Sequence, residues 1–219
     1  MTVLDWLNSM PERGLRLVYG RVYLRPPRPR DWRAWARLRH RSQAFLTPWE
    51  PTWPDDALER AAFRRRLRQY ADEMRQGKGY TFLIFRRSDN ALVGGISLMN
   101  LRRGVAQTAT LGYWIGAPYA RTGYMSEALS AVLDFAFDTL GLHRVEAASL
   151  PHNVASQGLL RKVGFTEEGH AREYLRINGR WQDHVLFAIL RHDPRGVAAK
   201  RHDAVPAPPP DETYLSRIK

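Results

Sequence analysis

A strand, a tight turn and a helix follow one another without a break between Trp114 and Leu129, and this segment is the one best suited to chemistry. The turn contains Arg121 and Gly123 and leads directly into the helix. Backbone N–H groups in such a turn converge on one point at the positive end of a helix dipole. Because this arrangement suits a pyrophosphate, the segment predicts a protein that holds a phosphorylated carrier.

A second helix opening lies downstream, at Pro151–Ser156, and the helix that follows is expected to end at Gly164. Asn153 stands at the N-cap position, where its side chain can accept a hydrogen bond from a free backbone amide. The two helix openings together suggest a carrier held beside a reacting group.

Hydrophobic spacing predicts the framework that positions these motifs. Strands are expected at residues 15–19, 22–24, 80–85, 92–99, 108–116, 143–150, 171–177 and 181–190. Helices are expected from Asp31 to about 41, from Asp55 or Asp56 to 76, from the Gly123 turn through an apolar stripe to Gly141, and from 153 to 163. Asn178-Gly179 between the last two strands is a strong hairpin signal. The order indicates a mixed α/β fold in a single domain.

The chain has 219 residues, 44% of them hydrophobic, which is enough for one domain with a real core. We expect an N-terminal extension at 1–14, the domain at 15–192 and a flexible tail rich in proline and charge at 193–219. The absence of cysteine excludes disulfides, thiol nucleophiles and thiolate metal sites. No apolar run approaches the roughly 20 residues of a membrane span, and no secretory signal is evident. A cytoplasmic protein with no membrane partner is therefore expected.

The formal net charge is +12, and most of the 34 basic residues are arginine. One interpretation is attraction to RNA, a ribonucleoprotein particle or a polyanionic cofactor. The other is that these residues are solvated helix faces. The run from Arg60 to Arg68 favours the second, because its basic positions spread around a helix and no aromatic platform for bases accompanies them. Arg102 and Arg103 could meet an acidic partner or rRNA.

Several segments, in order along residues 15–192, resemble the GNAT acetyltransferase superfamily. The resemblance is specifically to the RimJ-type branch, which acetylates the N-terminal alanine of ribosomal proteins. The segments are PWEP at 48–51, LGYWIG at 111–116, the Gly123 loop followed by SEAL at 126–129, PHN at 151–153, GF at 164–165 and NGRWQDHV at 178–185.

The resemblance implies a GNAT fold, in which flanking helices cover a mostly antiparallel sheet that splays in the middle around acetyl-CoA. It places the pantetheine along Tyr113, Trp114 and Ile115 and in contact with Asn153. It assigns the pyrophosphate to the backbone amides of Arg121, Thr122, Gly123, Tyr124, Met125 and Ser126. Ala120 and Met125 depart from the usual loop residues, which main-chain binding tolerates. No metal is implied, and His143, His152 and His184 lack a metal-ligand spacing.

The catalytic positions are less clear. Many relatives carry a tyrosine, the general acid for the leaving thiolate, seven residues after the asparagine; here that position is Leu160. Ser156 lies one turn earlier on the same helical face and is the candidate donor. The alternative is that its hydroxyl bonds to the backbone of its own helix. Glu146 is the candidate base, or it is simply a surface residue of its strand.

On the acceptor side, Trp49 and Glu50 could wall the pocket and pair with an incoming ammonium, or they could merely anchor a proline-flanked loop. An α-amine has a pKa of about 7.7–8.0 and a lysine amine about 10.4, so an α-amine demands less of a base. We therefore expect direct acetyl transfer to a protein N-terminus, on a ribosomal protein. Two alternatives remain: acetylation of a small-molecule amine (an antibiotic, polyamine or amino acid), and a non-catalytic CoA- and RNA-binding ribosome assembly factor. The sequence is compatible with either a monomer or a homodimer.

Overall fold

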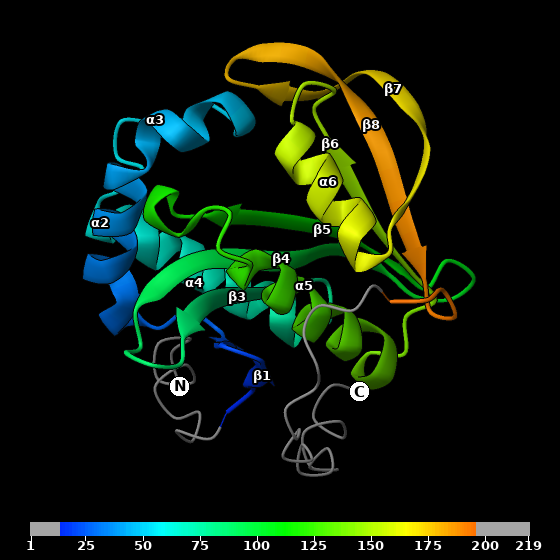
Figure 1. Cartoon of the computed structure of the whole chain (residues 1–219). Helices are drawn as coiled ribbons and strands as arrows, with labels where there is room; N and C mark the ends of the chain where they lie inside the picture. The colour runs from blue at the N-terminus through cyan, green and yellow to red at the C-terminus, as the bar shows by residue number, and fades with distance from the viewer. Residues whose placement is uncertain (1–13, 196–219) are drawn as a thin grey trace.

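An eight-stranded sheet with the order β1-β2-β3-β4-β5-β6-β8-β7 forms the framework of the protein (Figure 1). The computed structural model describes residues 14–195. All neighbouring strands are antiparallel except β5 and β6, which are parallel. The strands are β1 (Leu17–Tyr19), β2 (Val22–Arg25), β3 (Tyr80–Arg86), β4 (Leu92–Arg102), β5 (Thr108–Ile115), β6 (Arg144–Ser149), β7 (Thr166–Ile177) and β8 (Arg180–Leu190).

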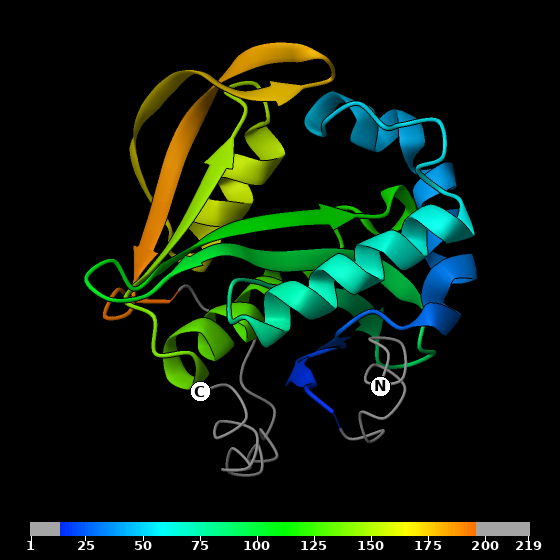
Figure 2. The ribbon, with the colours of Figure 1, turned by 180° about the vertical axis from the view of Figure 1, so that it is seen from behind.

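Helices cover both faces of the sheet. They are η1 (Pro29–Asp31), α2 (Trp32–Arg41), α3 (Gln43–Leu46), η2 (Thr47–Trp49), α4 (Arg60–Arg75), η3 (Ala117–Tyr119), α5 (Tyr124–Asp134), the π-helical η4 (Phe135–Thr139) and α6 (Val154–Val163). α5 and α6 lie in front of the sheet in Figure 1, and α4 lies in front of the opposite face in Figure 2. No helix within residues 14–195 is both long enough and apolar enough to cross a bilayer.

Two hydrophobic clusters fill the layers. The larger cluster joins the sheet to α5 and α6 and contains the apolar stripe of α5, in which Leu129, Val132 and Leu133 are all but completely buried. The smaller cluster joins the sheet to α2 and α4, where the rings of Trp35 and Phe63 lie 5.0 Å apart. The predicted core stripe is therefore confirmed, and the sheet is held between two helical layers.

The predicted elements are all present, with corrections at their ends. α4 begins at Arg60, after the N-cap residue Glu59, and neither Asp55 nor Asp56 caps it; Asp56 instead pairs with Arg65. Asp31 precedes α2 but its side chain does not cap that helix; its carboxylate accepts from Arg28 N–H at 2.6 Å and from Arg25 Nη1 at 2.7 Å.

In the second half of the chain, β7 begins at Thr166, earlier than the hydrophobic pattern indicated. Much of this edge strand is exposed, so it lacks the alternation that marks a half-buried strand. Asn178 and Gly179, both with positive φ, form the predicted hairpin turn. Residues 1–13 and 196–219, which include nearly all of the predicted extension and tail, lie outside the described residues.

Candidate active site

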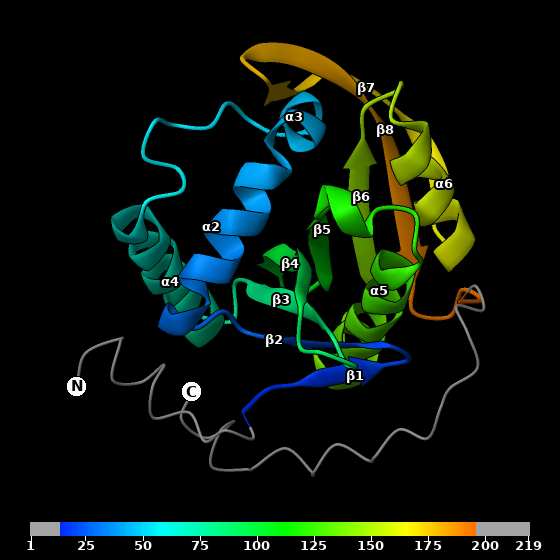
Figure 3. The same cartoon turned by 60° about the vertical axis from the view of Figure 1, so that its left-hand side comes forward.

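The parallel pairing of β5 with β6 stops partway along β5. It runs from Thr108 opposite Arg144 to Thr110 opposite Glu146, and beyond it the strands diverge (Figures 1 and 3). The predicted splay is thus confirmed. Tyr113, Trp114 and Ile115 all lie beyond the last pair, where the β5 edge that faces β6 has no strand partner among the described residues. Because backbone N–H and C=O groups need partners when buried, this edge suits an extended ligand with amide groups.

Side chains of β5 alternate between the two faces of the sheet at the split. Tyr113 and Ile115 pack against the cluster beneath α5 and α6, and Trp114 packs against the cluster beneath α2 and α4. This alternation is what a strand dictates. A ligand along the β5 edge would therefore have side chains from both helical layers beside it.

The Gly123 turn has the backbone geometry of an anion site. Gly123 is the N-cap of α5 with φ of +89°, and Arg121 has φ of +60°. Thr122 Oγ1 donates to the Tyr119 carbonyl at 2.6 Å, which fixes the turn. Glu127 N–H donates to the Gly123 carbonyl, which is the first hydrogen bond of the helix. The amides of the three preceding residues (Tyr124, Met125 and Ser126) therefore have no acceptor inside the helix. These amides can bind an external anion, as the sequence predicts.

Ser126 adds a buried, unsatisfied hydroxyl to this turn. The residue is only 5% exposed, and its Oγ has no hydrogen-bond partner. A buried polar group without a partner costs free energy until it gains one. The backbone of this turn therefore fits the diphosphate of CoA, and the turn also contains the unpaired Ser126 hydroxyl.

Sequence reasoning missed the pair that supports this turn. The buried Glu127 carboxylate accepts hydrogen bonds from Arg21 N–H at 2.6 Å and Arg21 Nε at 2.7 Å. Arg21 Nη2 also donates to the Thr122 carbonyl at 3.0 Å. The arginine thus neutralises a carboxylate that would otherwise repel an anion at the same helix end. The available signal was a charged glutamate within the mostly apolar buried side of α5.

Tyr113 and Ser156 meet across the split. Tyr113 Oη and Ser156 Oγ share a hydrogen bond of 2.8 Å, and burial raises the pKa of Tyr113 to about 12. Asn153 caps α6 as predicted, since its side chain accepts from Ser156 N–H at 3.1 Å. Leu160, at the position of the usual tyrosine, is fully buried in the core. The hydroxyl of Ser156 therefore contacts the neutral phenol rather than a carbonyl of its own helix, and the phenol can orient it.

Glu146 lies apart from this pair. Its carboxylate accepts from Arg144 Nε at 2.9 Å and forms a longer ion pair with Arg102 at 3.6 Å. Val145 and Ala147, its neighbours on β6, pack into the cluster beneath α6, so strand alternation puts Glu146 on the opposite face. The structure does not bring the predicted acid and base together on one face.

Glu50, predicted to pair with an incoming ammonium, already has a cationic partner. Arg39 Nη1 and Nη2 donate to its two oxygens at 2.7 and 2.6 Å, and Trp53 Nε1 donates at 2.8 Å. Arg39 also stacks over the rings of Trp53 and Trp114, at 4.2 and 4.9 Å. Of the two interpretations left open by the sequence, these contacts favour loop anchoring: Glu50 ties its loop to α2 and, through Arg39, to β5.

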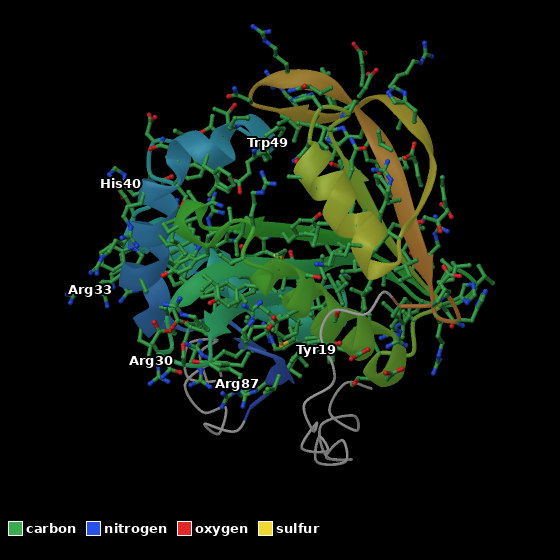
Figure 4. The ribbon with its side chains drawn as sticks, viewed as in Figure 1. Tyr19, Arg30, Arg33, His40, Trp49 and Arg87 are labelled. Atoms are coloured by element: carbon green, nitrogen blue, oxygen red, sulfur yellow. The ribbon has the colours of Figure 1, made fainter. Side chains whose placement is uncertain are left out.

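Trp49 lies at the mouth of the split. Its ring is 5.4 Å from the ring of His152, in the turn before α6, and Figure 4 shows it on the side of η2 that faces α6. The Glu50 carbonyl accepts from Asn178 N–H at 2.9 Å, which attaches the same loop to the β7–β8 hairpin. These contacts bring three segments far apart in the sequence together at this end of the split.

Two further polar side chains, Asp183 and His184, lie on β8. Asp183 accepts from Glu173 N–H at 2.8 Å, which braces an irregular stretch of β7. His184 is buried, and desolvation lowers its pKa. Within residues 14–195, no group of three or more His, Asp or Glu side chains could hold a metal ion.

The chain is similar to known acetyltransferases. The family model of the acetyltransferase (GNAT) domain matches residues 21–166. The [ribosomal protein uS5]-alanine N-acetyltransferase of Escherichia coli (strain K12) is 35% identical over 195 residues, covering 87% of this chain and 97% of that protein. The probable N-acetyltransferase YjcK of Bacillus subtilis (strain 168) is 37% identical over 172 residues, covering 78% and 95%.

A solved structure adds a similar fold with a bound carrier. Mycobacterium smegmatis RimJ in complex with CoA-disulfide superposes with a TM-score of 0.74 at 35% identity, over 80% of this chain and 86% of that chain.

Proposed function

This chain belongs to the GNAT acetyltransferase family, and we propose that it acetylates the N-terminal α-amine of a ribosomal protein that begins with alanine. GNAT acetyltransferases use acetyl-CoA, which supplies the acyl group as a thioester. The identity of the acceptor is part of what we propose. It is supported by the 35% identity to a ribosomal-protein-alanine N-acetyltransferase over nearly the whole of that protein. The cytoplasm, where ribosomes are found, is the proposed site of action.

One observation about the site carries the choice of acceptor. Both carboxylates expected near the acceptor, Glu50 and Glu146, are bound to arginines. The site therefore offers neither of them as a free base or as a counter-ion for a polycationic small molecule. An α-amine with a pKa of about 7.7–8.0 is partly neutral near pH 7, whereas a lysine amine near 10.4 would need deprotonation worth about 3.4 kcal/mol more.

We assign the binding of acetyl-CoA and the stabilisation of charge to residues of α5, β5 and α6. In the proposal, the amides at the start of α5 and the Ser126 hydroxyl hold the diphosphate, and the open edge of Tyr113–Ile115 aligns the pantetheine. Asn153 fixes the first turn of α6 and contacts the pantetheine arm. Backbone amides of β5 stabilise negative charge on the thioester oxygen during attack.

Ser156 is the proposed proton donor to the departing thiolate. In the proposal its hydroxyl accepts from the Tyr113 phenol, one of the two directions open to this pair, and its own proton is then free to donate into the split. A thiol has a pKa of about 8.5, so a weak donor is sufficient. Trp49 forms one wall of the acceptor opening, and Glu50 acts by holding that wall in place.

A peptide panel tests the proposal. Release of CoA thiol is measured with peptides that begin with Ala, Ser or Thr, with N-blocked peptides that contain lysine, and with spermidine. The proposal expects turnover with free N-terminal peptides and highest kcat/KM for alanine. Turnover confined to blocked lysine peptides or to spermidine would overturn the α-amine assignment.

A further inference from the structure

Two rows of exposed arginines run along α2 and α4, the helices that cover the other face of the sheet from α5 and α6. The rows are Arg33, Arg37 and Arg41 on α2, and Arg60, Arg64 and Arg68 on α4. Each row repeats every four residues, so its side chains lie on one side of their helix over about 12 Å. Figure 3 shows the two helices side by side.

The rows meet at a pocket. Pro29, Arg30, Trp32, Arg33 and Arg60 line a hollow of about 260 Å³ between the start of α2 and the start of α4. Trp32 Nε1 donates to the Leu58 carbonyl at 3.0 Å, which fixes the indole beside the arginines. Figure 4 shows Arg30 and Arg33 along the outer side of this region. The aromatic platform absent from the 60–68 segment is thus provided by α2.

Few acidic residues accompany these arginines: Asp31 lies just before α2, and Asp55, Asp56 and Glu59 lie just before α4. α2 contains no acidic residue, and the first acidic residue of α4 is Asp72, beyond its row. Across residues 14–195, no salt bridge involves any of the six row arginines; the one from this part of α4 joins Arg65 to Asp56. Like charges four residues apart repel, and Arg60 at the start of α4 faces the positive end of the helix dipole. An external polyanion would remove both penalties.

We propose that the two rows and the Trp32 pocket bind RNA. Guanidinium groups match phosphate geometry, and an indole face accepts a stacked unpaired base. An anionic membrane fits less well, because none of the large exposed apolar side chains of the described residues lies on α2 or α4. The inference extends the proposed function, since an RNA-rich particle carries the proposed acceptor, but binding does not require acetyl transfer.

The test is fluorescence anisotropy with a labelled RNA hairpin that has an unpaired loop, measured over a salt series without acetyl-CoA. The row variant is Arg33→Gln/Arg37→Gln/Arg60→Gln/Arg64→Gln. The matched control, Arg172→Gln/Arg176→Gln/Arg180→Gln/Arg191→Gln, lowers the net charge equally at exposed positions in and after the β7–β8 hairpin. We expect the row variant to raise Kd at least about tenfold and to reduce the slope of log K against log salt by about 3, with the control near wild type.

Three results would overturn the inference: no RNA binding by the wild type, an equal loss in both variants, or equal binding of a polyglutamate peptide with the same dependence on the rows. Two further measurements accompany the anisotropy. The row variant should unfold at no lower temperature than the wild type, because repulsion is removed. It should also acetylate free N-terminal peptide at the wild-type rate, which separates this inference from the proposed function.

Discussion

Tyr113 Oη and Ser156 Oγ lie 2.8 Å apart, and their hydrogen bond joins β5 to α6 across the split in the sheet. The two residues come from opposite sides of the opening in which we propose that the thioester lies. Burial raises the pKa of Tyr113 to about 12, so the phenol stays neutral at physiological pH and can donate to the serine. The proposed proton donor is therefore oriented by a neighbour that does not ionise.

Replacing Ser156 with alanine tests the donor. We expect kcat for an alanine-initiated peptide to fall about tenfold, below the usual range for general acids, because the thiol leaving group needs little assistance. KM for acetyl-CoA should change little. Steady-state kinetics with thiol detection gives both values.

The matched control is Ser97→Ala, which removes the hydroxyl that Thr81 contacts at 3.0 Å elsewhere on the sheet. A double variant, Tyr113→Phe/Ser156→Ala, should be no slower than the worse single variant, because the two hydroxyls act as a unit. Full activity in Ser156→Ala, or strictly multiplicative losses, would argue against the assignment.

Substituting Gly123 tests the anion site. A Cβ at this position would lie 3.0 Å from Arg21 Nη2, and φ is +89°. Gly123→Ala should therefore cost about 1–2 kcal/mol of unfolding free energy and weaken CoA binding by about tenfold, measured by denaturation and calorimetry.

Gly158 of α6 supplies the contrast, because a Cβ there would meet nothing within 4 Å. Gly158→Ala should stabilise the protein by about 0.5–1 kcal/mol and leave CoA affinity unchanged. Unaltered CoA binding in Gly123→Ala would remove this turn from the proposed site.

Glu50→Gln separates a loop-holding role from an ammonium-binding role. Arg39 is buried and would lose its counter-ion. We therefore expect the free energy of unfolding to fall by about 2–3 kcal/mol, slightly less than for fully buried pairs. Chemical denaturation measures it, and KM for the peptide should rise together with the loss of stability. A raised KM with unchanged stability would instead favour the alternative that Glu50 binds the substrate amine.

His184 predicts a pH dependence of stability. Burial lowers the pKa of His184 below the unfolded value of about 6.5. As the pH falls below that value, the unfolded chain therefore binds a proton at this residue before the folded chain does. Stability contributed by this residue is present above the unfolded pKa and falls as the pH drops below it. The melting temperature should fall less between pH 7 and pH 5 in His184→Gln than in the wild type or in the exposed control His152→Gln. Identical slopes in all three would refute it.

The sequence predicted the fold because its signals are local. The Asn178-Gly179 turn, the apolar stripe of α5 and the Asn153 cap each depend on residues a few positions apart, and each is confirmed. Sequence reasoning was less reliable where a side chain binds a residue that the local pattern does not include. Asp31 looked like the cap of α2, but the Arg25 side chain and the Arg28 amide bind it; the sequence left open whether Glu50 pairs with substrate or anchors its loop, and Arg39 binds it.

The same limit applies to the site. The Gly123 turn could be found from sequence, since adjacent residues build it. The pairs Tyr113–Ser156 and Arg21–Glu127 could not, because they join residues 43 and 106 positions apart and no local pattern records the contact. The arginine rows are visible as four-residue spacings, but only folding shows that Trp32 lies where they meet.

Tandem mass spectrometry of an acetylated peptide tests the proposed function most directly. The purified protein is incubated with acetyl-CoA and a peptide that begins with a free alanine α-amine and contains an internal lysine. We predict a single acetyl group, located by its fragments on the α-amine of the alanine. Acetylation only on the lysine side chain, or no product alongside CoA binding of normal affinity, would contradict the proposal.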